Sequence, residues 1–307
     1  MDEILRLFPS TLRQAVQKKI KSRWDELEEI RIRMHQPVEL NFHHKVEWVA
    51  HPRPNEQDSE YVMNQLSEFS LYRLENELRE GFVTIEGGHR VGLAGKVNTL
   101  NGAVKSIHHI SFFNIRIAKA KEGAALALLP YIYHKDYLNT LFVGPPQSGK
   151  TTMIRDVIRW ISTGWRTIPP QKVGVVDERS EIAASIRGVP QHNLGHRTDV
   201  LDACPKAEGM MMLIRSMSPN VIVVDEIGNK QDADALMEAI HAGVTVICTA
   251  HASSLTELKN RPSFQMLLDN HIFKRIIFLQ REPFPGHVQS VYDEEENNIW
   301  KRVGMHV

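Results

Sequence analysis

The stretch Gly144-Pro-Pro-Gln-Ser-Gly-Lys-Thr-Thr152 decides the fold. It begins with the pattern G-x-x-x-x-G-K-[ST], whose glycines permit a tight turn with backbone N–H groups pointing inward. Such a turn surrounds phosphate oxygens. A short apolar strand, Leu141-Phe-Val143, precedes the loop, and a helical pattern from Thr151 to about Ser162 follows it. This strand–loop–helix order predicts a P-loop nucleotide site.

The loop supplies both the expected nucleotide contacts and one expected metal ligand. Lys150 brings a positive charge to the β- and γ-phosphates, and the Thr151 hydroxyl can bind Mg²⁺. The following helix adds its positive N-terminus. We therefore expect ATP and Mg²⁺ as ligands. The residues expected to bind the nucleotide are Gly144, Pro145, Pro146, Gln147, Ser148, Gly149, Lys150, Thr151 and Thr152.

A second motif, Val221-Ile-Val-Val-Asp225-Glu226, is a buried apolar strand that ends in two acids. At the carboxyl end of a parallel strand, Asp225 can reach Mg²⁺, usually through water. Glu226 can polarise the attacking water as a general base. An acidic pair after a strand can also simply begin a helix. Its position after the P-loop, with one strand between, favours the catalytic role.

The segment Val175-Val-Asp177-Glu178-Arg179 repeats this pattern, and its strand should end at the same edge of the sheet. Glu178 is therefore a rival to Glu226 for activating water. The alternative is that Glu178 caps a helix or forms a surface ion pair. A fourth apolar strand ends at Thr249-Ala-His251, where a histidine could sense the γ-phosphate. A structural role is the alternative for His251.

The order of elements predicts two domains joined by a connector. From Leu138 onward, strands alternate with helices, which predicts an α/β fold with a mostly parallel sheet. Residues 1–118 mix helices and strands, so we expect a smaller α+β N-terminal domain there, a helical connector at 119–137 and the nucleotide-binding domain at 138–307. We also expect helices at about 58–79 and 201–217.

Composition narrows the class of protein. Lys plus Arg and Asp plus Glu both number 37 in 307 residues, so the formal charge is zero. This balance makes a dedicated nucleic-acid binder less expected. The two cysteines, Cys204 and Cys248, have neither metal-ligand nor disulfide spacing. The chain starts without a signal-peptide pattern and has no apolar run of ~20 residues, so we expect a cytoplasmic protein that reaches a membrane only through partners.

Taken together, the four motifs resemble those of the secretion and type IV pilus traffic ATPases, which are hexameric motors with a RecA-like engine. The segment from Leu213 to Gly228 looks much like the traffic-ATPase segment that leads into its acidic strand. A narrower resemblance is to the stage III sporulation AA family of endospore-forming bacteria. It extends to the N-terminal part, through Leu27-Glu-Glu-Ile-Arg-Ile-Arg33, Gly81 to Gly95 and Asn114-Ile-Arg-Ile-Ala118.

The resemblance implies properties that the residues alone do not. It implies a homohexamer docked on a secretion-like membrane channel in the mother cell, with the N-terminal domain and the engine moving against each other. Arginines would complete the site: Arg116 is the first candidate and Arg90 a weaker one, while Arg215 matches an arginine of the traffic-ATPase segment. Many traffic ATPases carry Gly where this chain has Asp225, so its Mg²⁺ contact rests on general P-loop chemistry.

The sequence thus predicts an ATP-hydrolysing motor, with in-line attack of water on the γ-phosphate. Two alternatives stay open. One is a nucleotide-gated scaffold that binds ATP and hardly hydrolyses it, although such a scaffold would need neither acidic pair. The other is a nucleic-acid motor or loader, which the zero net charge makes less expected.

Overall fold

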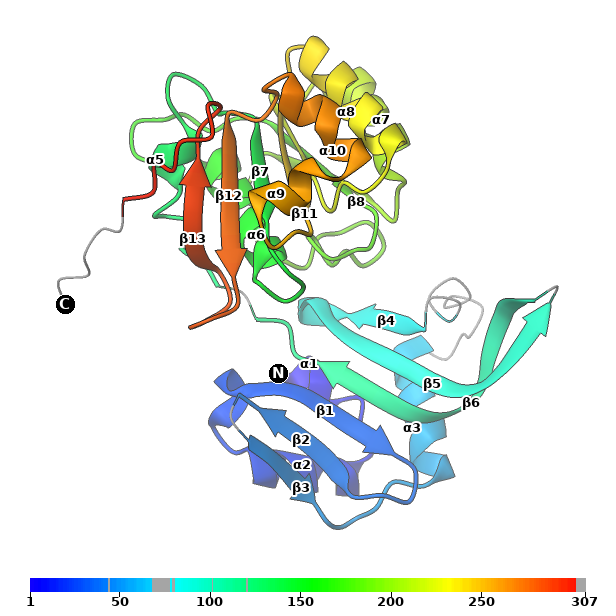
Figure 1. Ribbon diagram of the computed structural model, residues 1–307. Coiled ribbons are helices and arrows are strands. Elements are labelled where there is room, and N and C mark those ends of the chain that lie inside the picture. The colour runs from blue at the N-terminus through cyan, green and yellow to red at the C-terminus, as the bar shows by residue number, and fades with distance from the viewer. Residues whose placement is uncertain (44, 68–77, 79–80, 101, 120, 302–307) are drawn as a thin grey trace. The chain divides into compact units, whose positions relative to one another are not determined.

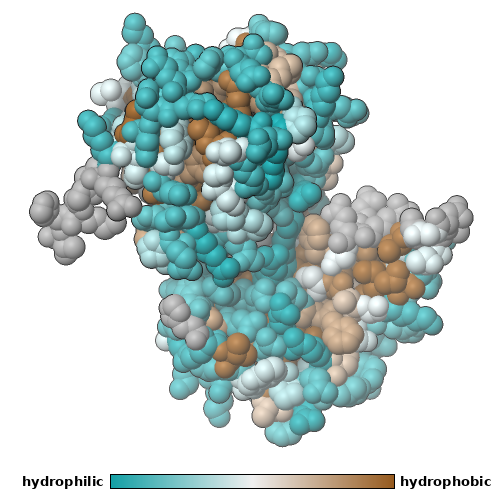
Figure 2. Space-filling model, viewed as in Figure 1, coloured by the Kyte–Doolittle hydropathy of each residue, from teal (hydrophilic) through white to brown (hydrophobic). Residues whose placement is uncertain are grey.

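The computed structural model describes residues 1–43, 45–67, 78, 81–100, 102–119 and 121–301 (Figure 1). The chain divides into two compact units, Met1–Lys119 and Ala120–Val307. Each unit has a sheet of its own. No helix within the described residues is long and apolar enough to cross a membrane. Figure 2 shows a visible face of mostly hydrophilic residues, with hydrophobic ones in small separate areas.

The first unit is built on an antiparallel sheet with the strand order β3-β2-β1-β6-β5-β4. Its strands are β1 (Leu27–Arg33), β2 (Val38–Phe42), β3 (Lys45–Val49), β4 (Phe82–Ile85), β5 (His89–Leu100) and β6 (Ala103–Arg116). Its helices are α1 (Asp2–Leu5), α2 (Ser10–Ile20) and α3 (Glu56–Ser67), with short 3₁₀ turns at Arg23–Asp25 and Glu86–Gly88.

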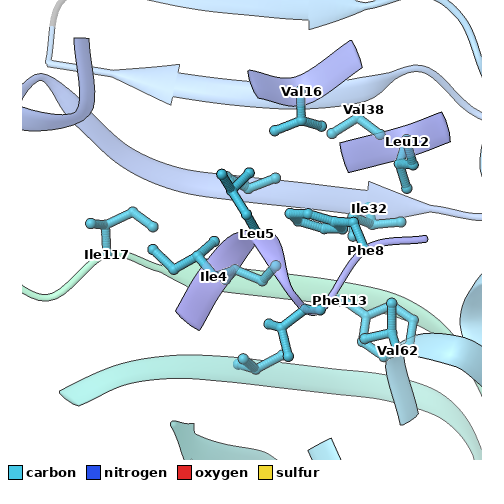
Figure 3. Packing of buried hydrophobic residues seen from close by; sticks show 14 of the residues in the cluster. Ile4, Leu5, Phe8, Leu12, Val16, Ile32, Val38, Val62, Phe113 and Ile117 are labelled. Carbon is cyan, nitrogen blue, oxygen red and sulfur yellow. The ribbon is translucent and has the colours of Figure 1, made fainter. Parts of the chain in front are cut away.

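One face of this sheet carries the core of the unit. Helix α2 buries Leu12, Val16 and Ile20, which are spaced four residues apart and so share one side of the helix. Figure 3 shows Leu12 and Val16 beside Ile32 and Val38 of the sheet. Charged residues alternate with the buried ones in β1, so the opposite face of the sheet is polar.

The second unit is built on a seven-stranded sheet with the order β13-β12-β7-β11-β10-β8-β9. All neighbouring strands are parallel except β12 and β13. The strands are β7 (Thr140–Val143), β8 (Val173–Asp177), β9 (Thr198–Asp202), β10 (Val221–Val224), β11 (Thr245–Ala250), β12 (Arg275–Gln280) and β13 (His287–Tyr292). The α/β prediction with a mostly parallel sheet and a smaller N-terminal unit is therefore confirmed.

Helices cover both faces of this sheet, which is why its central strands are apolar throughout. In β7, Leu141 and Val143 pack into the core on one face, whereas Phe142 packs into the core on the other. The first core includes α7 (Lys206–Met217), α8 (Lys230–His241), α9 (Leu255–Lys259) and α10 (Pro262–Asp269), and the second includes α5 (Leu129–Ile132) and α6 (Lys150–Thr163).

Several boundaries differ from the sequence predictions. The connector predicted as helical at 119–137 has a single four-residue helix, α5, preceded by turns. The helix predicted from about Leu201 begins only at Lys206, because residues 198–202 form the edge strand β9. The helix predicted at 58–79 runs from Glu56 to Ser67, and most of its remainder lies outside the described residues. Helices α9 and α10 were not predicted.

A buried carboxylate ties the start of the second unit to the helix that follows the P-loop. Asp156 on α6 accepts hydrogen bonds from the backbone N–H groups of Gly123 and Ala125, at 3.1 and 2.8 Å. Arg159, one turn later, donates to the same carboxylate at 2.6 Å. The turns at 121–128 are thereby held on α6 without regular helical structure of their own.

Candidate functional site

The P-loop joins β7 to α6 at the carboxyl edge of the parallel sheet. Gly149 has φ 87° and Gln147 has φ 63°, the left-handed conformations that the tight turn requires. A Cβ at position 144 would lie 2.5 Å from the Leu279 carbonyl oxygen, so only glycine fits there. The Ser148 hydroxyl is buried and has no hydrogen-bond partner within the described residues. Backbone geometry and an unpaired hydroxyl together fit a loop built around phosphate.

Lys150 is buried at the start of α6, and its ammonium group stays within the loop. It donates to the carbonyl oxygens of Gly144 and Pro145, at 2.8 and 2.9 Å. It also lies 3.1 Å from Nδ1 of His251. Burial lowers the pKa of Lys150, although the negative charges of Asp225, Glu226 and Glu181 act to raise it. The lysine is therefore placed among acids that a bound phosphate would join.

The ends of β10 and β11 bring the second acidic pair and the histidine together. Asp225 accepts a hydrogen bond from the Thr249 hydroxyl at 2.9 Å, and burial raises the pKa of Asp225. A carboxylate oxygen of Glu226 lies 3.2 Å from Nε2 of His251. Since Lys150 contacts the other ring nitrogen, His251 bridges the P-loop lysine and Glu226. A lysine ammonium only donates, so Nδ1 accepts and the ring proton of a neutral His251 is on Nε2.

The end of β8 carries the first acidic pair, which has different contacts. Asp177 is fully buried and accepts backbone hydrogen bonds from Glu181, Ile182 and Ala183, at 2.8 to 3.0 Å. Burial raises the pKa of Asp177 to about 6, although these bonds act to lower it. Glu178 forms an ion pair with Lys206 at the start of α7. The surface ion pair considered for Glu178 is thus the contact that the structure contains.

Glu181 is a site residue that sequence reasoning missed. Its charge acts on Lys150 and on Asp225 and favours a higher pKa for both. Partly buried Arg155 on α6 donates to the carbonyl oxygens of Glu181 and Ile182, at 3.0 and 2.9 Å. Burial lowers the pKa of Arg155 to about 10. Asp177 and Arg155 together fix the loop that presents Glu181.

Two of the three predicted arginines belong to the first unit, and the third belongs to the second unit. Arg116 is exposed on β6 of the first unit, 3.9 Å from Glu29. The guanidinium of Arg90, on β5, lies over the Phe82 ring at 4.2 Å. Arg215 is exposed in the last turn of α7, just before the amino end of β10. Since the P-loop lies at the carboxyl ends of the strands, Arg215 does not reach the P-loop of its own chain.

The residues present fit a magnesium nucleotide. Thr151 is half-buried in the first turn of α6, and Asp225 follows β10, which is separated from β7 by β11. A Mg²⁺ ion at a P-loop takes a hydroxyl, phosphate oxygens and water rather than a complete protein cage, so these two oxygen donors suffice. The unpaired Ser148 hydroxyl and the inward lysine are consistent with an anionic ligand.

The motifs and the geometry around them agree with the family comparison. Residues 1–299 match the protein family described as "Sporulation stage III, protein AA". The chain belongs to this family. Its relative "Stage III sporulation protein AA" of Bacillus subtilis (strain 168) is 50% identical over 305 residues, which cover 99% of both chains. The narrower of the two resemblances is confirmed.

Solved structures support the fold of this family member. The pilus retraction motor PilT with bound ADP aligns with a TM-score of 0.58 at 16% identity, covering 90% of this chain and 77% of PilT. The ATPase DotB of Yersinia pseudotuberculosis aligns with a TM-score of 0.57 at 14% identity, covering 88% and 75%. The protein is therefore a sporulation stage III protein with the fold of secretion and pilus ATPases.

Proposed function

We propose that this protein is an ATP-hydrolysing motor of a secretion-like membrane channel complex that acts on the mother-cell side during endospore formation. The observation that carries the proposal is the contact chain from Lys150 through His251 to Glu226, at the ends of three adjacent parallel strands. A protein that only bound nucleotide would need the loop and its lysine. It would not need a carboxylate positioned beside them.

The proposed reaction is the attack of water on the γ-phosphorus, in line with the bond to the leaving oxygen of ADP. Glu226 takes a proton from the water as the new P–O bond forms, and the electrons of the broken bond leave with ADP. Lys150 and the loop N–H groups hold the phosphate charge. Bound Mg²⁺, held by Thr151 and reached by Asp225 through water, would neutralise part of that charge.

His251 and Glu181 have supporting roles in this proposal. The γ-phosphate would take the place of the loop carbonyls and the imidazole as the partner of Lys150. His251 would then be released from Lys150, and with a proton on each ring nitrogen it would donate from Nδ1 to the phosphate and from Nε2 to Glu226. Glu181 adds negative charge near Lys150 and Asp225, which favours the charged lysine and a bound cation.

The motor would work as a homohexamer on the cytoplasmic face of the membrane, attached through partner proteins. In such a ring, Arg116, Arg90 or Arg215 of one subunit would complete the site of its neighbour. The exposure of Arg116 and Arg215 supports this arrangement, because an arginine that acts on another chain must be accessible. Nucleic acid is not an expected partner.

The test is Mg²⁺-dependent ATP hydrolysis by the full chain, with the oligomeric mass measured on the same sample. Lys150→Ala should abolish ATP binding, because it removes the phosphate-binding charge. Glu181→Gln should lower turnover about tenfold while ATP still binds, since its charge acts on the site without contacting the attacking water. Glu208→Gln, at an exposed acid on α7, is the matched control and should leave turnover unchanged. If the wild type binds ATP and does not hydrolyse it, even with membrane partners present, the motor hypothesis is wrong and the scaffold hypothesis takes its place.

A further inference from the structure

The strand order gives the nucleotide a direction. β11 and β10 lie on one side of β7, and β12 lies on the other. His251, Asp225 and Glu226 follow β11 and β10, so in the proposed function the γ-phosphate end of ATP would face that side. The nucleoside end would then lie toward β12 and the loop that follows it. This orientation rests on the proposed function.

The loop between β12 and β13, residues 281–286, packs directly on the P-loop. The backbone N–H of Gly286 donates to the Ser148 carbonyl oxygen at 2.8 Å. A Cβ at position 149 would lie 2.6 Å from the Gly286 nitrogen, so the two loops are in van der Waals contact. The position of the 281–286 loop is therefore fixed relative to the residues that hold the phosphates.

This loop presents an aromatic ring to solvent. Phe284 is 44% exposed, so its ring is accessible to a ligand. The edge of His287 meets it at a ring-centroid distance of 5.3 Å and an interplanar angle of 90°. The ammonium of Lys121 lies 5.3 Å from the ring centroid. The Phe284 ring thus contacts His287 and Lys121 and is still partly accessible to solvent.

We propose that Phe284 is the platform on which the base of the bound nucleotide stacks, with Lys121 beside it as a cation near the ribose and α-phosphate. A base presents an extended π-face, and stacking on an exposed aromatic ring buries apolar surface of both. No base-reading hydrogen bond is required. The platform should therefore favour purine nucleotides over bare polyphosphate, with little discrimination between adenine and guanine.

The first experiment titrates the full-length protein with Mg-ADP and with inorganic tripolyphosphate plus Mg²⁺, by calorimetry. Phe284→Ala should weaken ADP binding about tenfold, as expected for loss of one stacked base, and leave tripolyphosphate binding unchanged. Lys150→Ala should weaken both. Met266→Ala removes a similarly exposed apolar side chain, from α10, and should change neither.

Each other outcome decides the matter. Unchanged ADP affinity in Phe284→Ala overturns the platform, and so does an equal loss for both ligands, which would mean that the 281–286 loop only supports the P-loop. A wild type that binds neither compound overturns the proposed function and this inference with it. A wild type that binds tripolyphosphate as tightly as ADP overturns the platform and leaves the P-loop site standing.

Phe284→Trp gives a direct reading of contact. This variant should keep wild-type ADP affinity, because the indole stacks at least as well as the phenyl ring. Its added fluorescence, relative to the wild type, should fall on addition of ADP and stay constant with tripolyphosphate. Equal responses to both ligands would overturn stacking on this side chain.

Discussion

The ends of β8 and β10 make an instructive pair. Both are apolar parallel strands that end in Asp-Glu, namely Asp177-Glu178 and Asp225-Glu226. After β10, Asp225 bonds a neighbouring strand through Thr249, and Glu226 contacts His251. After β8, Asp177 binds backbone N–H groups of its own loop, and Glu178 pairs with Lys206. The same tetrapeptide, Val-Val-Asp-Glu, thus contributes to the proposed nucleotide site at the end of β10 and stabilises a loop at the end of β8.

The difference follows from distance along the sheet. β10 is separated from β7 by one strand, β11, whereas β8 lies one strand further out. Neighbouring strands are about 4.8 Å apart. The β8 end is therefore farther from the P-loop by a distance that a carboxylate side chain does not span. The loop after β8 carries Glu181, whose charge acts on Lys150 and Asp225. An acid's place in the sheet order, more than its sequence motif, decides its contacts.

The largest effect should separate the two glutamates. Glu226→Gln should lower the rate of ATP hydrolysis about a hundredfold or more and keep ATP binding, because the general base is lost while the P-loop and Lys150 that hold the phosphates stay. Glu178→Gln should leave the rate within about twofold. Single-turnover hydrolysis and nucleotide titration of both variants provide the measurement. A reversal of the two rates would make Glu178 the catalytic acid.

An intermediate effect on folding should appear at Asp177. Asp177→Ala leaves three backbone N–H groups without an acceptor, two of them buried and one part-buried, so the free energy of unfolding in urea should fall by about 3 kcal/mol. Asp225→Ala, whose carboxylate has one side-chain partner among the described hydrogen bonds, should cost about 1 kcal/mol. An equal loss in both would remove the structural distinction between the two strand ends.

The pH dependence of Asp177 provides a second reading of the same site. Its pKa is about 6 in the folded chain and 3.8 when unperturbed, so between these values the folded state binds the extra proton. Stability from this group is therefore present at low pH and lost as the pH rises through about 6. Asp177→Asn should flatten the fall in the free energy of unfolding between pH 4 and 7. Asp199→Asn, an exposed acid on β9, is the control.

The smallest effect should follow from breaking the Glu178 ion pair. Lys206→Met should change the free energy of unfolding by less than about 1 kcal/mol, because Glu178 is partly exposed and solvent screens the pair. ATP hydrolysis should stay within about twofold of wild type. A large loss of hydrolysis would mean that Lys206 holds Glu178 for a catalytic role, which would undo the comparison.

Sequence reasoning located the central strands because they are buried on both faces and read as unbroken apolar runs. It missed β9, Thr198-Asp-Val-Leu-Asp202, since an edge strand is only half-buried and alternates acids with apolar residues. It identified the P-loop by its glycine-lysine pattern, and the acids of β10 by their position after that loop. It did not find Glu181, four residues past Asp177 in a loop without regular structure.

Glu181 could have been suspected from one signal only, an additional acid in a loop that leaves the carboxyl edge. The backbone of Glu181 is held by two hydrogen bonds that no local sequence pattern predicts. Arg155 donates one to its carbonyl oxygen, and its own N–H donates the other to Asp177. Phe284 is a similar case. A phenylalanine between two prolines is typical of an ordinary loop. Only the hydrogen bond from the Gly286 N–H to the Ser148 carbonyl oxygen shows that this loop packs on the P-loop. Both examples depend on contacts between segments far apart in the sequence.

The attachment of Gly123 and Ala125 to Asp156 has a mechanical consequence. The chain enters the second unit through these turns, and two hydrogen bonds fasten them to the helix that begins at Lys150. Tension applied to the chain from its N-terminal side is therefore borne first by α6. Both hydrogen bonds are accepted by the same buried carboxylate. The helix that begins at the P-loop lysine therefore also anchors the segment through which the chain enters the second unit.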